Sequence, residues 1–152
     1  MPSVTGSAST GGWAVNTMAA MYKTARPSDG ALRHEAQPLV DILMATYNGA
    51  KYLSQQLDSL LAQTHQNFRL LVSDDGSTDN TLALLETYRF RFGGRMVVVP
   101  YPHRGQGVVK NFENLMRTSL QDGLARSVAF CDQDDVWLPH KIERCLQVLR
   151  AA

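Results

Sequence analysis

Several absences limit what this 152-residue chain can be. It has two cysteines, Cys131 and Cys145, outside any CxxC pair, so we expect reduced thiols rather than a disulfide framework or a zinc site. No apolar run approaches the roughly 20 residues that a transmembrane helix needs. The formal net charge is only +1, which is too small for the chain as a whole to attract nucleic acid electrostatically. We therefore expect a cytoplasmic protein with no nucleic-acid partner, with the inner face of the membrane as an alternative location.

Acidic residues are also missing from the start of the chain, where none precedes Asp29. Residues 1–37 are rich in Ser, Thr, Gly and Ala and show no sustained hydrophobic period. This composition is typical of a disordered leader. Hydrophobic residues make up 44% of the whole chain and charged residues 19%, which is enough for a packed core. We therefore expect residues 38–152 to form one folded domain.

From Pro38 onward, short apolar runs alternate with segments of helical periodicity. The expected strands are residues 40–46, 68–72, 96–99 and 127–131. The segments between and after them predict helices over about 53–61, 82–88, 108–116 and 139–149. Ser77 is expected to cap the second helix. This β-α-β-α-β-α-β-α order predicts an α/β fold with a mainly parallel sheet and helices on both faces.

Individual apolar side chains are expected to pack against this sheet, whereas the histidines are expected at the surface. The apolar residues in question are Tyr52, Leu82, Val108, Phe112, Trp137, Leu138 and Leu149. His65, in particular, has no metal-ligand spacing to another histidine or cysteine.

Polar residues directly follow three of the predicted strands: Thr46-Tyr47-Asn48, Asp74-Asp75 and Asp132-Gln133-Asp134-Asp135. The carboxyl ends of parallel strands meet at one edge of the sheet, where ligands bind in open α/β folds. Clustered carboxylates repel a phosphate, since two like charges ~4 Å apart cost about 4 kcal/mol at an effective dielectric near 20. A bound Mg²⁺ or Mn²⁺ would turn this repulsion into attraction, because carboxylate and phosphate oxygens can share one cation.

Each motif also has a plain structural interpretation. An isolated D-x-D is typical of an exposed turn with a helix-capping Asp, and Asp-Asp-Gly-Ser is typical of a tight turn. Their occurrence in one order, each after a strand, favours a shared binding site.

The segments DILMATYNGAKYLSQQLDSLLAQT, LLVSDDGSTDNT and AFCDQDDVWLPHKI resemble the N-terminal signature of family 2 glycosyltransferases over residues 40–149. The last segment is also similar to bacterial, rhamnosyltransferase-like enzymes of surface polysaccharide synthesis. The resemblance implies a truncated, Rossmann-like GT-A fold that forms the nucleotide-sugar-binding half of the enzyme. It further implies transfer from a nucleotide-diphosphate sugar, UDP- or dTDP-linked above all, to a saccharide or lipid-linked acceptor, with inversion.

The resemblance also carries site residues over by position. The implied nucleotide-sugar-binding residues are Ala45, Thr46, Tyr47, Asn48, Asp74, Asp75, Lys110, Asp132 and Gln133. Asp132 and Asp134 would hold Mn²⁺ or Mg²⁺, which would stabilise the diphosphate leaving group. Lys110 would pair with a phosphate near a helix N-terminus at Gly107, although a solvated helix surface is an equal interpretation of that lysine.

Members of this family continue past the last predicted helix, with an acceptor groove and an Asp or Glu base. The catalytic base is therefore expected beyond residue 152, and we expect weak nucleotide-sugar binding without efficient transfer. Two alternatives stay open. The first alternative is a non-catalytic nucleotide-binding or interaction module derived from a glycosyltransferase. The second is a phosphatase similar to the haloacid dehalogenases. The D-x-D-x-V motif of those phosphatases fits Asp132 to Val136, although theirs follows the first strand of the fold.

Overall fold

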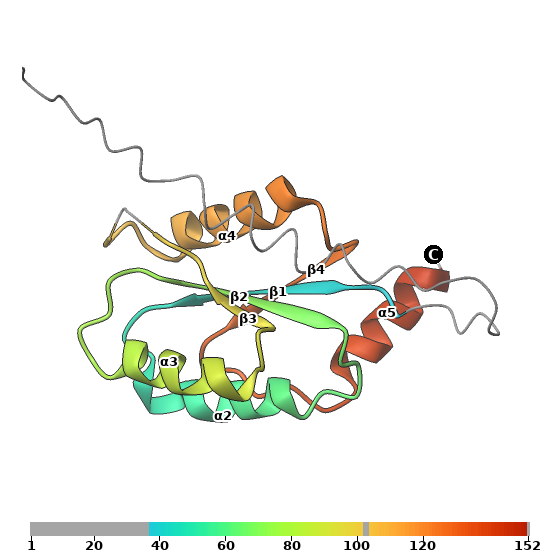
Figure 1. Cartoon of the computed structure of the whole chain (residues 1–152), viewed down its shortest axis with the longest axis horizontal. Coiled ribbons are helices and arrows are strands. Elements are labelled where there is room, and N and C mark those ends of the chain that lie inside the picture. Colours follow the sequence, from blue (N-terminus) through green and yellow to red (C-terminus); the bar gives the residue numbers. More distant parts are fainter. Residues whose placement is uncertain (1–36, 102–103, 152) are drawn as a thin grey trace, which may run out of the picture. The chain divides into compact units, whose positions relative to one another are not determined.

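The computed structural model describes residues 37–101 and 104–151. The predicted leader, residues 1–37, therefore lies outside the described residues, except for Gln37. In the described part, four parallel strands alternate with four helices (Figure 1), and this confirms the predicted α/β class and element order.

The sheet has the strand order β3-β2-β1-β4. Its strands are β1 (Val40–Thr46), β2 (Phe68–Asp74), β3 (Met96–Val98) and β4 (Ser127–Asp132). The helices are α2 (Ala50–Leu61), α3 (Thr81–Arg91), α4 (Val108–Asp122) and α5 (Lys141–Ala151). In the register of β1, Thr46 pairs with Asp74 of β2 and Ala45 pairs with Asp132 of β4. The carboxyl ends of these three strands therefore lie side by side.

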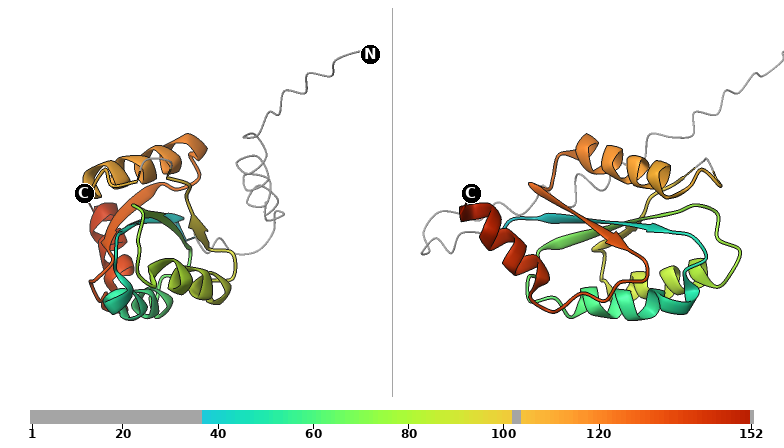
Figure 2. Two further views of the ribbon diagram at one scale, coloured as in Figure 1. Left: turned by 90° about the vertical axis from the view of Figure 1, so that its left-hand side faces the viewer. Right: turned by 180° about the vertical axis from the view of Figure 1, so that it is seen from behind.

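Helices cover both faces of the sheet, with α4 on one face and α2 and α3 on the other (Figure 2). Side chains of β1 alternate between the two faces, as expected for a strand. Ile42 and Met44 belong to the larger cluster with α2, α3 and α5, whereas Leu43 joins Leu115 of α4 in the smaller cluster. Burying one such aliphatic side chain contributes roughly 1.5–3 kcal/mol relative to leaving it exposed.

The α4 face also holds a buried ion-pair network at the amino ends of β1 and β2. Arg69 donates from Nε to Asp41 Oδ1 at 2.9 Å and from Nη1 to Asp122 Oδ2 at 2.6 Å. Ser119 Oγ donates to Asp41 Oδ2 at 2.6 Å. Burial alone would lower the pKa of Arg69, but its hydrogen bonds to the two aspartates outweigh this effect and raise it. The network fastens the last turn of α4 to the sheet.

Ser77 lies too far before helix α3 to cap it, and its side chain has other partners. Its hydroxyl donates to Asp74 Oδ2 at 2.6 Å and accepts the backbone N–H of Asn48 at 2.8 Å. The first residue of the helix is Thr81, and the prediction that Ser77 caps it was wrong.

Several predictions of burial were also wrong, mostly because the helices bury only a narrow stripe. The residues found exposed are Tyr52, Leu82, Val108, Leu138 and Leu149. His65 is buried instead, with Nε2 3.0 Å from the carbonyl oxygen of Pro38. Trp137 is buried as predicted.

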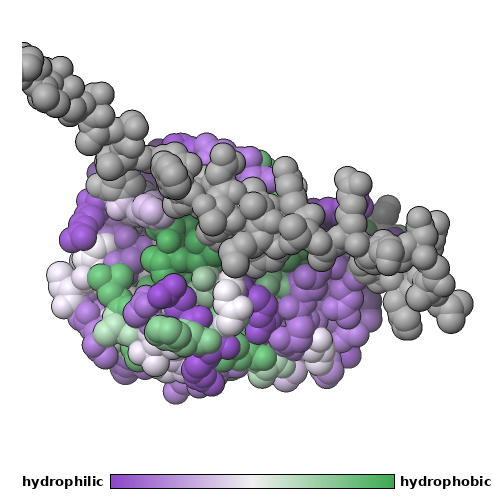
Figure 3. Space-filling view, viewed as in Figure 1, coloured by the Kyte–Doolittle hydropathy of each residue, from purple (hydrophilic) through white to green (hydrophobic). Residues whose placement is uncertain are grey.

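On the face seen in Figure 3, hydrophobic side chains lie among hydrophilic ones. Among the described helices, none combines the length and the apolar character that a bilayer crossing requires.

Candidate functional site

A cavity of about 430 Å³ lies at the carboxyl ends of β1, β2 and β4. Its volume falls within the ~300–1,000 Å³ typical of small-molecule sites. The lining residues are Ala45, Thr46, Tyr47, Asp75, Gly105, Gly107, Val108, Asn111, Asp132, Gln133 and Asp134. Parallel pairing thus brings seven of the predicted site residues to one cavity, and leaves Asn48, Asp74 and Lys110 outside its lining.

Asp132 and Asp134 are exposed and line this cavity. Within residues 37–101 and 104–151, neither carboxylate has a hydrogen-bond or ion-pair partner. Carboxylate oxygens are ligands that Mg²⁺ and Mn²⁺ prefer, so the chemistry of this pair fits a divalent cation.

The described residues contain no cluster of three or more His, Cys, Asp or Glu suited to a metal ion. Two carboxylates would leave coordination positions for phosphate oxygens, which is how Mg²⁺ is commonly held at phosphate sites.

Asp74 lies beside the cavity, with all its acceptor capacity used internally. Its Oδ1 accepts the backbone N–H groups of Gly76 at 3.0 Å and Ser77 at 2.8 Å. Its Oδ2 accepts the hydroxyls of Thr46 at 2.7 Å and Ser77 at 2.6 Å. The structure thus makes Asp74 the anchor of the turn after β2.

Asp75 is buried and does line the cavity. Its two oxygens accept the backbone N–H groups of Gln106 at 3.1 Å and Gly107 at 2.8 Å. An ionised carboxylate offers about four acceptor positions, so each oxygen keeps one for a ligand. Gly107 has φ 85°, a left-handed conformation that favours glycine. Asp75 therefore holds the N-terminus of α4 at the cavity wall.

Asn111 was not predicted as a site residue. It is buried on α4, lines the cavity, and donates from Nδ2 to the carbonyl oxygen of Ser73 at 2.8 Å. This bond fastens the first turns of α4 to the end of β2. A signal was present in the sequence, since Asn111 interrupts the apolar stripe Val108–Leu115, where a buried amide needs a partner.

Asn48 and Lys110 have partners outside the cavity. Asn48 adopts φ 46°, and its Oδ1 accepts the backbone N–H of Thr78 at 2.8 Å, which ties the loop after β1 to the loop after β2. Lys110 is exposed, and its Nζ lies 2.8 Å from Oε2 of Glu113. The structure thus places Lys110 on a solvated helix surface, which was one of its two interpretations.

Neither cysteine lines the cavity. Cys131 is buried, and burial raises the pKa of its thiol to about 12 even though Gln56 donates to Sγ at 2.6 Å. A thiol of that pKa stays protonated at neutral pH and is unreactive. Cys145 is exposed, and both cysteines are free, as expected.

The chain belongs to glycosyl transferase family 2, whose family model matches residues 41–152. A dTDP-rhamnosyl transferase of Shigella flexneri, RfbG, is 33% identical over 106 residues, which make up 70% of this chain and 36% of that protein. This membership confirms the resemblance seen in the three motifs. It also shows that the haloacid-dehalogenase alternative was wrong, in keeping with the position of Asp132 at the end of β4 rather than of β1.

Solved structures confirm the partial GT-A fold. TarS of S. aureus, residues 1–349 in complex with UDP-GlcNAc, matches with a TM-score of 0.61 and 27% identity over 74% of this chain and 31% of that one. The mannosyltransferase PcManGT of Pyrobaculum calidifontis, in complex with GDP-Man and Mn²⁺, has a TM-score of 0.55 and 22% identity over 80% of this chain and 34% of its own. The chain spans about a third of the length of each of these three proteins.

Proposed function

We propose that this chain is the nucleotide-sugar-binding part of a family 2 glycosyltransferase and that it binds its ligand together with Mn²⁺ or Mg²⁺. The observation that carries the proposal is the cavity at the carboxyl ends of the strands, where Asp132 and Asp134 have no partner in the described residues. The UDP-GlcNAc bound by TarS and the dTDP-rhamnose chemistry in the name of RfbG support a UDP- or dTDP-sugar.

The described residues suggest how each part of such a ligand would be held. Tyr47 is 55% exposed at the cavity, so its ring is available to stack on a nucleoside. Asp75 has acceptor capacity for an N–H of the base. The N–H groups in the first turn of α4 that Asp75 does not accept would attract a phosphate group, together with the helix dipole. A bound cation would stabilise the diphosphate as it leaves.

The rest of the reaction is proposed from the family. The acceptor site, and an Asp or Glu that takes the proton of the attacking hydroxyl, would belong to the part of the relatives that this chain does not match. The acceptor would be a saccharide or a lipid-linked sugar of a surface polysaccharide, and the transfer would invert the anomeric centre.

Thermal unfolding of the chain with UDP, dTDP, GDP and ADP, each with and without Mn²⁺, tests the proposal. A ligand at ~100 times its Kd should stabilise the native state by about 2.7 kcal/mol. We expect one pyrimidine diphosphate to stabilise the chain in a Mn²⁺-dependent way. Asp134→Asn should remove that dependence. The matched control is Asp135→Asn, which removes the same charge one residue away, outside the cavity lining, and should retain it.

A folded chain that no nucleotide stabilises would contradict the proposal. Stabilisation that Asp134→Asn leaves unchanged would contradict the assignment of the cation site. Release of free nucleoside diphosphate from a nucleotide sugar in the presence of Mn²⁺ would in turn exclude the non-catalytic alternative.

A further inference from the structure

The side chain of Gln133 forms two hydrogen bonds with the backbone of a single residue, Tyr47. Its Oε1 accepts the backbone N–H of Tyr47 at 3.0 Å, and its Nε2 donates to the carbonyl oxygen of Tyr47 at 3.0 Å. The parallel pairing of β1 and β4 ends with Ala45 opposite Asp132. The carboxamide of Gln133 thus continues the connection between these two strands beyond their last backbone pair.

Gly49 provides the space that this carboxamide occupies. A Cβ atom at position 49 would lie 2.1 Å from Oε1 and 2.6 Å from Cδ of Gln133. Gly49 has φ −97°, which any residue can adopt, so the backbone conformation does not require glycine. Close approach of the Gln133 side chain is therefore the physical reason for a glycine at this position.

We propose that Gln133 is a positioning residue that holds the Asp132–Asp134 turn and Tyr47 in fixed relation at the cavity. Gln133 is the peptide neighbour of both unpaired carboxylates, so fixing its side chain restricts the backbone that carries them. The same two bonds fix the backbone of Tyr47, whose exposed ring lines the cavity. Because this turn and Tyr47 are already ordered in the free protein, binding a ligand does not have to order them and costs less conformational entropy.

The neutral amide is the one side chain of this length that can make both bonds. A carboxylate would accept the N–H of Tyr47 but could not donate to its carbonyl oxygen, and it would add a third negative charge between two others. Gln133 therefore acts on a nucleotide through Tyr47 and the aspartates rather than through direct contact. This inference rests on the proposed function, because it assumes that the cavity binds a nucleotide with a cation.

The test compares nucleotide binding with and without Mn²⁺ in the full chain. The substitution Gln133→Met keeps the length of the side chain and removes both hydrogen bonds. We expect UDP, or the diphosphate that best stabilises the wild type, to bind at least tenfold more weakly in Mn²⁺. Without Mn²⁺ the loss should be smaller, because only the stacking of Tyr47 on the nucleoside is then affected. The matched control is Gln55→Met on an exposed position of α2, where we expect no change.

Gly49→Ala provides a second, independent variant, because it displaces the carboxamide and leaves Gln133 and both aspartates in the sequence. Gly49→Ala should weaken Mn²⁺-dependent binding as Gln133→Met does, and the double variant should be no weaker than the single ones. Wild-type binding with an unchanged Mn²⁺ dependence in Gln133→Met would overturn the positioning role and leave the proposed function intact. Absence of nucleotide binding by the wild type would overturn both.

Discussion

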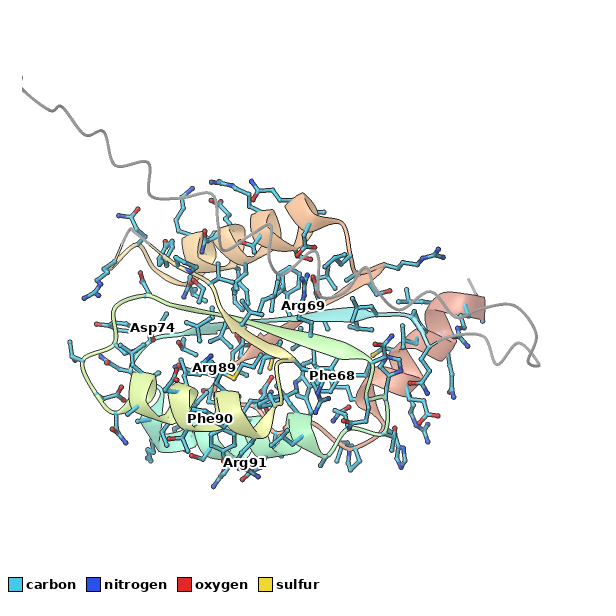
Figure 4. The ribbon with its side chains drawn as sticks, in the orientation of Figure 1. Phe68, Arg69, Asp74, Arg89, Phe90 and Arg91 are labelled. Carbon is cyan, nitrogen blue, oxygen red and sulfur yellow. The ribbon has the colours of Figure 1, made fainter. Side chains whose placement is uncertain are left out.

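Acidic side chains lie at both ends of the parallel sheet, but the two ends differ in whether the carboxylates have partners within the protein. At the amino ends, Asp41 and Asp122 both pair with the buried Arg69. At the carboxyl ends, Asp132 and Asp134 face the cavity without a partner in the described residues. Figure 4 shows Arg69 near one end of β2, with Asp74 at the other.

The difference between the two ends shows which carboxylates are free to bind a ligand. A carboxylate removed from water must be compensated within the protein, as Asp41 is by Arg69 and Ser119. An exposed carboxylate is compensated by water, which a cation or a ligand can displace. We therefore expect substitutions at the amino ends to affect stability and those at the carboxyl ends to affect binding.

The largest effect is expected for Arg69→Met, which leaves Asp41 buried without its counter-charge. Removing one partner of a buried pair costs about 3–5 kcal/mol, so we expect a loss of that order in the free energy of unfolding. Urea denaturation measures it. Arg91→Met, which breaks the exposed ion pair with Asp58, is the control and should change stability little.

Combining Arg69→Met with Asp41→Leu sharpens the same comparison. If the cost arises from an uncompensated buried charge, the double variant should recover much of the lost stability, because hydrophobic replacements of buried pairs are often tolerated. A double variant less stable than Arg69→Met alone would show instead that the pair itself is required for packing.

The second prediction concerns Asp74, which stands between the two classes. Asp74→Asn leaves one acceptor oxygen for four hydrogen-bond donors and places an NH₂ group against some of them, so we expect a loss of about 2 kcal/mol in the free energy of unfolding. Urea denaturation again gives the value. Unchanged stability together with lost nucleotide binding would mean that Asp74 contacts the ligand directly.

The third prediction concerns Asp134 at the open end. Asp134→Asn removes a charge next to other carboxylates and breaks no hydrogen bond in the described residues, so the free energy of unfolding should change by no more than about 0.5 kcal/mol. Mn²⁺-dependent nucleotide stabilisation should disappear in the same sample. A clear loss of stability in Asp134→Asn would place this residue with Asp41 rather than with a binding site.

The fold could be predicted from the sequence more completely than the roles of its individual polar residues. Buried parallel strands are recognisable as short apolar runs, so the order of elements was correct. The hydroxyl of Ser77 was misassigned because its partner Asn48 lies 29 residues away and is brought close only by the pairing of β1 and β2. The role inferred for Gln133 depends on the register of β1 and β4, which no local pattern contains. The neighbouring aspartates Asp74 and Asp75 cannot be told apart in the sequence, because they differ in their partners and in whether they line the cavity.

The smallest effect is expected for the reactivity of the two cysteines. They show the same contrast between a buried and an exposed position. Alkylation of the native chain at pH 8 should modify Cys145, which is exposed, and spare Cys131, which is buried. Mass spectrometry should find one modified thiol in the native state and two in denaturant. Two modified thiols in the native state would show that the end of β4 opens readily.

The same burial gives stability a pH dependence of known sign. Burial raises the pKa of Cys131 from an ordinary value of 9.0 to about 12, so the folded chain keeps this proton where the unfolded chain loses it. Its contribution to stability is therefore complete below about pH 9 and is lost as the pH rises toward 12. Replacing Cys131 with Val should flatten this decline, since the substitution removes the titrating group and keeps an apolar side chain. An equally steep decline in Cys131→Val would assign the alkaline loss to other groups, and the burial of this thiol would then have no part in it.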